Sequence, residues 1–108
     1  MPTTLTLDTA RSDDGKPVLI AVGEIDLSNV DTFAQTLAAA VSDTAGSGET
    51  LTLDLSAVEY LDSAAINILF PHAERIRIIA HPLLIRVFDI SGLTELATIE
   101  PAPSQAER

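Results

Sequence analysis

Cysteine and tryptophan are absent from this 108-residue chain, and aromatic residues make up only 4% of it. Without cysteine the chain can form no disulfide bond and can offer no thiolate as a nucleophile or metal ligand. Its hydrophobic residues, 46% of the total, must therefore build a core from Leu, Ile, Val and Ala. Because this length is that of one ordinary domain, we expect a single core.

Basic residues are also scarce, since six Lys and Arg stand against sixteen Asp and Glu, for a formal net charge of -10. Such a surface repels nucleic acid and anionic membranes and attracts partners with a basic face. No apolar run approaches the roughly 20 residues that cross a bilayer, and the amino terminus lacks the pattern of a secretory signal. We expect a cytoplasmic protein with no direct nucleic-acid contact and no membrane insertion.

The amino-terminal region has the pattern of a β-hairpin. Residues 4–8 alternate leucine with threonine or aspartate, as in a half-buried strand. Residues 18–22 form a continuous apolar run, which predicts a strand covered on both faces. The Asp14-Gly15 pair between these segments is a strong turn signal.

A helix and a third strand are expected next. Apolar side chains recur at helical spacing at Val30, Phe33, Leu37 and Val41. Ser28 is placed to cap this helix, and Asp31 completes a capping-box-like pattern. Residues 50–56 then alternate leucine with polar side chains, which predicts a strand.

A second helix is predicted over residues 64–70. Asp62 or Ser63 can cap its start, and Pro71 indicates that it ends or kinks early. Residues 75–80 have the pattern of a fourth strand.

A third helix is expected to begin at Pro82 and to end at Gly92. Three apolar side chains share one face of it, namely Leu83, Val87 and Ile90. Residues 94–100 fit either a short helix or an edge strand.

This alternation predicts an α/β domain with a mixed, mostly parallel sheet of four to five strands and helical cover. We place the domain at residues 1–100 and expect residues 101–108 to form a disordered tail. Parallel crossovers would place loops such as residues 56–63 at the carboxyl end of the sheet, where α/β folds place their sites.

Candidate catalytic groups are few. Asp54 could suggest the phosphoacceptor of a receiver domain, but Asp13, Asp14 and the single lysine, Lys16, all fall in the hairpin turn. Asp54 is therefore interpreted as a strand residue that faces solvent or bonds the following loop.

Metal ligands and nucleotide-binding motifs are lacking as well. His72 and His81 stand apart, with no carboxylate at ligand spacing. No serine nucleophile motif and no phosphate-cradling glycine loop occurs. We predict no metal site, no cofactor and no enzymatic activity.

What remains is the Asp62-Ser63 pair. Its simplest interpretation is a helix N-cap, which is worth about 1 kcal/mol. The small side chains of Ala64 and Ala65 would, in addition, leave the Ser63 hydroxyl open to another protein's active site. A phosphate there would add roughly -1.5 to -2 charges, tolerated at a helix start but not by a docked partner. Modification would then control binding without unfolding the domain.

Three segments resemble the STAS family, specifically the small bacterial anti-sigma factor antagonists. They are GEIDLSNVDTF at residues 23–33, LTLDLSAVEYLDSAA at residues 51–65 and SGLTELATIE at residues 91–100. The resemblance implies a mixed sheet with helices and a partner-switching function. The unmodified antagonist would bind an anti-sigma factor, usually a serine kinase with an ATP site, and free a sigma factor. The kinase would phosphorylate the antagonist, and a phosphatase would reverse this.

The resemblance also assigns residues. It implies that Ser63 is the phosphoacceptor, with Asp62 as its acidic neighbour and Asp26 near the partner face. The partner-binding set that we infer is Asp26, Ser28, Asp62, Ser63, Ala64 and Asn67. Ser56 also matches the family pattern, and bonding of the loop after its strand is the interpretation we favour for it.

The chain departs from the family pattern at two places. Ala65 stands where the family usually has glycine, and the segment after Ser63 is shorter than usual, which implies a shortened second helix. The alternative function is therefore a STAS scaffold or adaptor without phosphorylation, or a module that senses a small anion or lipid.

Overall fold

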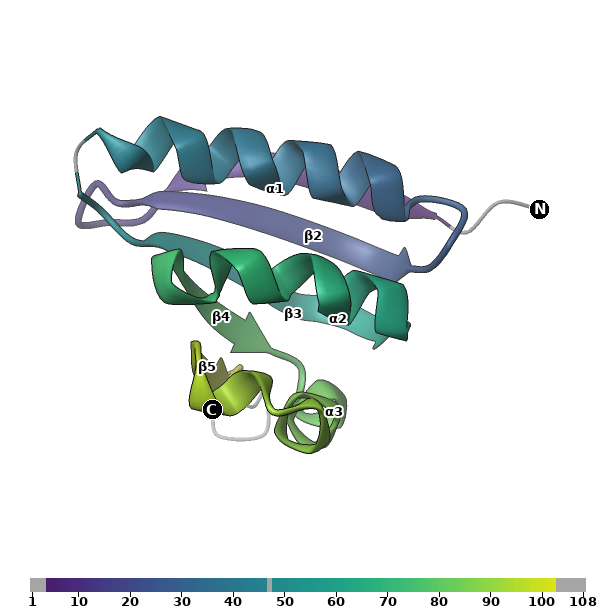
Figure 1. Cartoon of the computed structure of the whole chain (residues 1–108). Coiled ribbons are helices and arrows are strands. Elements are labelled where there is room, and N and C mark those ends of the chain that lie inside the picture. Colours follow the sequence, from purple (N-terminus) through teal and green to yellow (C-terminus); the bar gives the residue numbers. More distant parts are fainter. Residues whose placement is uncertain (1–3, 47, 103–108) are drawn as a thin grey trace, which may run out of the picture.

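The structure is a computed structural model, which describes residues 4–46 and 48–102. Its sheet has five strands in the order β1-β2-β3-β4-β5, with β1 antiparallel to β2 and every other pair parallel. This confirms the predicted α/β class with a mixed sheet (Figure 1). The elements are β1 Leu5–Arg11, β2 Pro17–Ile25, α1 Val30–Ala45, β3 Leu51–Leu61, α2 Ser63–Leu69, the 3-10 helix η1 Phe70–Arg75, β4 Ile76–Ala80, α3 Pro82–Ser91, the 3-10 helix η2 Leu93–Glu95 and β5 Thr98–Pro101.

The predicted hairpin is present between β1 and β2. Its turn uses Gly15 with φ of 85°. The Asp14 carboxylate accepts hydrogen bonds from the Ser12 hydroxyl and from the Lys16 N–H. The Ser12 bond is the largest of the effects that lower the pKa of Asp14 below its ordinary value. The turn is thus fixed by its own side chains.

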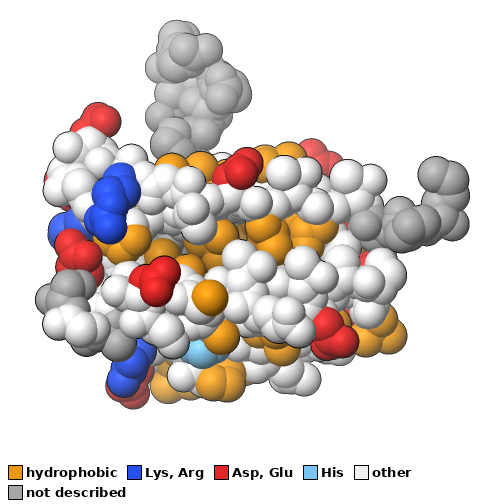
Figure 2. Space-filling view, turned by 90° about the horizontal axis from the view of Figure 1, so that it is seen from above, with side chains coloured by type: hydrophobic (Ala, Val, Ile, Leu, Met, Phe, Trp, Pro, Cys, Tyr) orange, Lys and Arg blue, Asp and Glu red, His pale blue; other side chains and the backbone are white. Residues whose placement is uncertain are grey.

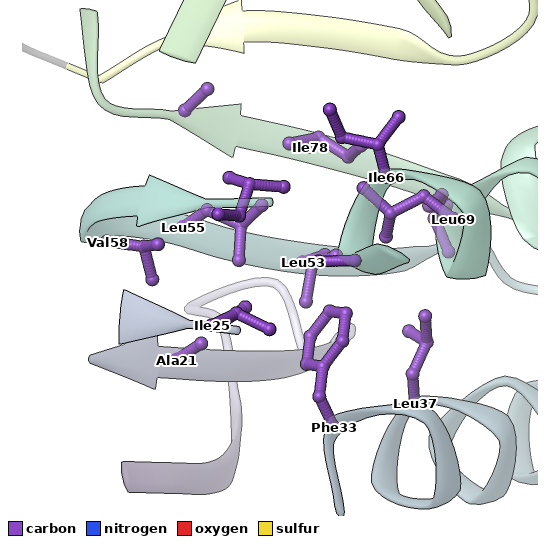
Figure 3. Close-up of a cluster of buried hydrophobic side chains, with 14 of the residues drawn as sticks. Ala21, Ile25, Phe33, Leu37, Leu53, Leu55, Val58, Ile66, Leu69 and Ile78 are labelled. Atoms are coloured by element: carbon purple, nitrogen blue, oxygen red, sulfur yellow. The ribbon is translucent and has the colours of Figure 1, made fainter. Parts of the chain in front are cut away.

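The core lies on one face of the sheet, beneath α1 and α2 (Figures 1 and 3). Phe33 and Leu37 of α1 and Leu69 of α2 are fully buried against this face. The strands contribute alternate residues, among them Leu19, Ala21, Leu51, Leu53, Leu55, Ile76 and Ile78. Leu84 and Phe88 of α3 belong to the same core.

The opposite face of the sheet has no helical cover within the described residues. Val18 and Ile20 are half-buried and Val22 is 45% exposed, so the prediction that residues 18–22 are covered on both faces is wrong. The reason is topological. Right-handed crossovers between strands in the consecutive order β2-β3-β4-β5 place every connecting helix on the same side.

The open face carries an ion pair between neighbouring strands. Arg77 of β4 and Glu100 of β5 approach to 2.7 Å, with each side chain about half exposed. Their hydrogen bond is the main cause that raises the pKa of Arg77 and lowers that of Glu100. Because both groups are solvated, the pair adds little stability.

The edge between β1 and α1 is less well filled. Seen from above, hydrophobic side chains run along the middle of the molecule (Figure 2). Leu5, Leu7 and Ala40 are partly buried against the core. A cavity of about 370 Å³ is lined by hairpin residues such as Arg11 and Pro17 and by Ala40 of α1.

Strand β3 is longer than predicted and runs to Leu61. Ile20 pairs with Asp54, but Val22 pairs with Ala57, so β3 contains an extra residue. A second register shift follows between Gly23 and Glu24. These bulges break the period-two pattern after Ser56, which explains why residues 56–61 were expected in a loop.

Gly23, which lies beside these bulges, has no room for a side chain. Its φ is 119°, and a Cβ built there would lie 2.3 Å from the Thr4 carbonyl oxygen. The Glu24 N–H donates to that same oxygen at 3.1 Å. Only glycine permits this close approach of Thr4, the residue before β1, to the end of β2.

The second helix is short, as predicted, but the chain remains helical beyond it. Pro71 ends α2 at Leu69 and lies in the first turn of η1, which continues to Arg75. Proline lacks an N–H but suits a first helical turn, so it changes the helix type rather than ending the helical path.

The third helix has the predicted ends. Its first helical residue is Pro82, and the His81 Nδ1 atom accepts a hydrogen bond from the Leu83 N–H at 3.0 Å. Gly92 ends it in the left-handed conformation with φ of 88°. Its core side chains are Leu84 and Phe88, whereas the predicted stripe begins and ends with the exposed Leu83 and Ile90.

The carboxyl-terminal segment adopts both predicted alternatives in turn. Residues 93–95 form η2 and residues 98–101 form β5 at the sheet edge. Of the predicted tail, Pro101 ends β5, and the Ala102 N–H donates to the Ala80 carbonyl at 2.8 Å. Residues 103–108 lie outside the described residues.

Candidate functional site

Two neighbouring parallel strands end in register at the carboxyl edge of the sheet. Ile25 of β2 pairs with Leu61 of β3, and the next residues are Asp26 and Asp62. The Asp62 N–H donates to the Ile25 carbonyl at 3.1 Å, which continues the ladder by one step. The two segments that carry the predicted site residues therefore lie side by side.

The segment between β2 and α1 is held by its own side chains. The Asp26 Oδ1 atom accepts from the Ser28 N–H at 2.9 Å and from the Ser28 hydroxyl at 2.6 Å. The Asn29 amide accepts from the Asp26 N–H and donates to the Glu24 carbonyl, both at 3.0 Å. These bonds close the loop on itself and fix the Asp26 carboxylate.

Ser28 does not cap α1, contrary to the sequence prediction. The N-cap position belongs to Asn29, and no side-chain cap is formed there. Ser28 lies one residue too early, and its hydroxyl is bound to Asp26 instead. Asp31 is exposed in the first turn, where it still favours the helix through its charge.

The junction between β3 and α2 has a single residue, Asp62. Its backbone is extended, with φ of -92° and ψ of -179°, and its Oδ1 atom accepts from the Ala65 N–H at 3.1 Å. Asp62 is thus the N-cap, and Ser63 is the first helical residue. Ser63 is exposed, and its hydroxyl makes no hydrogen bond within the part of the chain that the structure describes.

The two alanines after Ser63 have different roles. Ala65 is fully buried in the core, so its small size serves the packing of α2 and not the exposure of Ser63. Ala64 is half-buried beside Ser63. Asn67 is exposed one turn further along α2, on the same side as Ser63 because four residues separate them.

The structure therefore brings the predicted partner-binding residues to one edge of the sheet. Two further residues of the same loop were not singled out by sequence reasoning, Leu27 and Asn29. Leu27 is 78% exposed in the otherwise polar loop, and an isolated leucine between Asp26 and Ser28 was the signal that could have identified it. Asn29 could have been recognised as an N-cap residue that also bonds the loop.

The other polar candidates lie elsewhere. The Asp54 Oδ1 atom accepts from the Ser56 N–H at 2.9 Å and from its hydroxyl at 2.6 Å. The Ser56 hydroxyl is therefore bound within β3 rather than to a following loop. In the part of the chain that is described, no group of three or more His, Asp or Glu side chains could hold a metal ion.

Among residues 4–46 and 48–102, no helix is both long enough and apolar enough to cross a bilayer.

Comparison with known protein families identifies the family of this chain. Residues 9–99 match the family described as the Mlab STAS domain. That match covers most of the sequence, and the chain therefore belongs to the STAS domain family. A search of curated protein sequences gives no significant match.

Solved structures share the whole fold. An anti-sigma factor antagonist from Mycobacterium paratuberculosis is 27% identical, with a TM-score of 0.77 over 96% of this chain and 90% of its own. The anti-sigma factor antagonist SpoIIAA in its unphosphorylated form is 17% identical, with a TM-score of 0.66 over 94% and 92%. The phosphorylated form of SpoIIAA from Bacillus is 17% identical, with a TM-score of 0.61 over 94% and 96%.

Proposed function

We propose that this protein is a cytoplasmic anti-sigma factor antagonist whose binding is switched off by phosphorylation of Ser63. In its unmodified state it binds an anti-sigma factor, which then releases a sigma factor. Membership of the STAS family supports this function, as does the similarity to a mycobacterial protein that is itself named an anti-sigma factor antagonist.

The observation that carries the proposal is the state of the Ser63 hydroxyl. It is exposed, it is free of hydrogen bonds to the described residues, and it begins a helix whose cap is supplied by Asp62. Modification of Ser63 therefore breaks no contact that holds α2 in place. The neighbouring Ser28 differs, because its hydroxyl is bound to Asp26.

The chemistry that we assign to the partner is phosphoryl transfer. A kinase that is also the anti-sigma factor would transfer the γ-phosphoryl group of ATP to the Ser63 oxygen. Its catalytic base takes the hydroxyl proton, and ADP leaves. A phosphatase would later hydrolyse the phosphoserine and restore the hydroxyl.

The electrostatic setting explains why the phosphate would release the partner. Asp62 directly precedes Ser63, and Asp26 follows the neighbouring strand end. Roughly -1.5 to -2 charges would join these carboxylates. A docked protein would have to desolvate this dianion and would also lose its shape complementarity at Ser63. The fold tolerates the change because the group points into solvent.

A direct test measures phosphate incorporation by intact mass. The source-cell lysate with ATP should add one phosphate to the wild type and to the Ser28→Ala and Ser56→Ala controls, but none to Ser63→Ala. The phosphorylated wild type should lose the proteins that the Ser63→Ala variant captures. Equal incorporation in all four proteins would remove Ser63 from the mechanism.

A second candidate is a STAS adaptor that works without phosphorylation. The short α2 favours it, because a kinase would find only seven α-helical residues to dock on before the chain narrows to η1. In that case Ser63→Ala and Ser63→Asp would capture the same proteins equally well. A module that binds a small anion or lipid would instead be revealed by a ligand that raises the thermal midpoint.

A further inference from the structure

Strand β1 is an edge strand, and the hydrogen bonds at its two ends show which of its backbone groups face outward. Among the described residues it pairs only with β2. Just before the strand, the Glu24 N–H donates to the Thr4 carbonyl at 3.1 Å. Just after it, the Ser12 N–H donates to the Lys16 carbonyl at 2.9 Å. The register between these two bonds contains no shift.

Hydrogen-bonded pairs alternate along an antiparallel ladder. Because residues 4 and 12 both bond the opposite segment, the even-numbered residues of β1 bond β2 as well. The odd-numbered residues therefore direct their N–H and C=O groups away from β2. These outward residues are Leu5, Leu7, Thr9 and Arg11. A row of such groups is a template for pairing with another strand.

The two edges of the sheet differ in how open they are to pairing. β5 has four residues and ends in Pro101, which lacks an N–H. β1 has seven residues, with no proline and no bulge. Pairing of β1 with β5 of the next copy, which would build an open filament, is therefore disfavoured. Pairing of β1 with itself closes a dimer.

We propose that two copies of this chain associate through antiparallel pairing of their β1 strands, with a twofold axis at Leu7. Leu7 then pairs with Leu7 of the second copy, and Leu5 pairs with Thr9 of the second copy. Each of these pairs exchanges two hydrogen bonds between outward backbone groups. The two sheets thereby join into one continuous sheet.

Charge and side-chain type select this register. An axis at Asp8 would place two carboxylates directly opposite each other, at the close spacing of a non-hydrogen-bonded pair. An axis at Thr9 would place Arg11 opposite Leu7, and an axis at Thr6 would use fewer residues of the strand. The axis at Leu7 joins leucine with leucine and places Asp8 opposite Thr6, whose hydroxyl can donate to the carboxylate. β1 is thus complementary to a second copy of itself.

The second copy also occupies space that this chain leaves beside β1. Leu5 and Leu7 are only half-buried. A cavity of about 370 Å³ is lined by Thr9 and Arg11 and by Ala40 of α1. In the proposed register, Leu5 of the second copy lies opposite Thr9 on the same face of the sheet. Its side chain therefore lies next to this cavity and covers apolar surface there.

The helices leave room for this pairing. α1 packs on β2 and β3. Strands in a sheet are about 4.8 Å apart, so the two β2 strands would be roughly 14 Å apart across the β1 pair. Because a helix with its side chains is about 10 to 12 Å wide, the two α1 helices fit side by side over the joined sheet.

The dimer is expected to be weak. Two chains that each carry a net charge of -10 repel each other. The contact between two edge strands is also smaller than the roughly 800 Å² per partner that stable complexes bury. We expect a dissociation constant on the order of 100 µM. Added salt should lower it, because salt screens the overall repulsion.

Amide hydrogen exchange of the full chain, followed by NMR at about 20 µM and about 1 mM, tests the register residue by residue. The outward amides of Leu5, Leu7 and Thr9 should exchange roughly three- to fivefold more slowly at the higher concentration, since most chains are dimeric there. The Arg11 amide lies beyond the paired segment and should not change. The Asp8 amide bonds β2 in both states and is the internal control. An axis at Thr9 would instead protect Arg11 and leave Leu5 unchanged.

Two substitutions at Thr9 test the backbone bonds by sedimentation equilibrium over the same concentrations. Thr9→Pro removes an outward N–H in each copy without breaking a bond between β1 and β2, so it should weaken dimerisation by more than about tenfold. Thr9→Val is the matched control, because it keeps the N–H. It should dimerise at least as well as the wild type. Circular dichroism melts confirm that both variants are folded.

A gain of affinity tests the same register without proline. Thr6→Lys places an ammonium group opposite Asp8 of the second copy, twice in the dimer, and should tighten it by roughly three- to tenfold. Gln35→Lys adds the same charge at an exposed position of α1 and should change the dissociation constant by less than about twofold. This pair of variants decides the question if Thr9→Pro does not fold.

Four results would overturn the proposal. They are a wild type that stays monomeric at the highest concentration in added salt, outward amides that exchange equally fast at both concentrations, equal effects of Thr6→Lys and Gln35→Lys, and assemblies that grow beyond the dimer. A monomeric wild type whose outward amides are protected only by a different protein would assign the β1 edge to a strand of that protein. Phosphorylation of Ser63 plays no part in these measurements, so their outcome is independent of the proposed function.

Discussion

The two segments that meet at the carboxyl edge of the sheet are built in different ways. The β2–α1 loop has four residues, and the side chains of Asp26, Ser28 and Asn29 tie it to itself and to β2. The β3–α2 junction has one residue, Asp62, which continues the strand ladder and caps the helix. The first segment uses its polar groups for its own structure, whereas the second leaves the Ser63 hydroxyl unused.

At this edge of the sheet, the β2–α1 loop therefore has a structural role, whereas the β3–α2 junction tolerates modification. A loop that consumes its hydroxyl and amide groups presents a fixed surface, and changes to it cost stability. A junction fixed by the main chain and one carboxylate tolerates changes at the next residue. Substitutions at Asn29, Asp62 and Ser63 should therefore have effects on the free energy of unfolding that decrease in that order.

Asn29→Ala should have the largest effect. It removes the acceptor for the Asp26 N–H and the donor to the Glu24 carbonyl, as well as the residue at the N-cap position of α1. We expect a loss of about 2 kcal/mol in the free energy of unfolding, measured by urea denaturation. Asn67→Ala is the control, since Asn67 is exposed on α2 and should change stability by less than about 0.5 kcal/mol. Equal losses for the two variants would contradict the structural role of the loop.

Asp62→Ala should have an intermediate effect of about 1 kcal/mol, because it leaves the Ala65 N–H without its capping carboxylate. Asp62→Asn keeps an acceptor at the same position and should stay within about 0.5 kcal/mol of wild type. Thermal melts of the three proteins compare the two substitutions directly. If Asn were as costly as Ala, the charge of Asp62 would matter more than its hydrogen bond.

The sequence predicted the parts of the fold that follow local rules. The Asp14-Gly15 turn, the apolar row of α1 and the Pro82 and Gly92 ends of α3 all depend on neighbouring residues, and all are confirmed. The two bulges of β3 depend on its pairing with β2, so the alternation in residues 50–56 could not reveal them. The open face of the sheet likewise results from the handedness of the crossovers between strands, which cannot be read from the sequence of any one strand.

The site was predicted less evenly than the fold. Motif resemblance led to Ser63 and Asp62, and Asp62 does form the cap. Ser28 was assigned as a cap because serine favours that position, but the competing bond to Asp26 takes its hydroxyl. Ala65 was interpreted as clearance for Ser63, whereas its burial depends on how α2 packs on the sheet. Local propensity identifies the side chains that can cap a helix or bond a loop, but tertiary contacts determine which of them stay without a hydrogen bond.

Ser63→Asp should have the smallest effect on stability and the most specific effect on binding. An acidic side chain in the first helical position gains from the helix dipole but lies beside Asp62, and the two effects are opposed and of similar size. The free energy of unfolding should therefore stay within about 0.5 kcal/mol of wild type, while partner binding weakens as it would with a phosphate. Calorimetry of unfolding and titration against the captured partner measure the two quantities separately. Unfolding at Ser63→Asp would show that the hydroxyl is structural, and unchanged binding of a stable variant would show that this edge does not contact the partner. Asn29→Ala sharpens the contrast, because it should lower stability first and affect binding only through the fraction of folded protein.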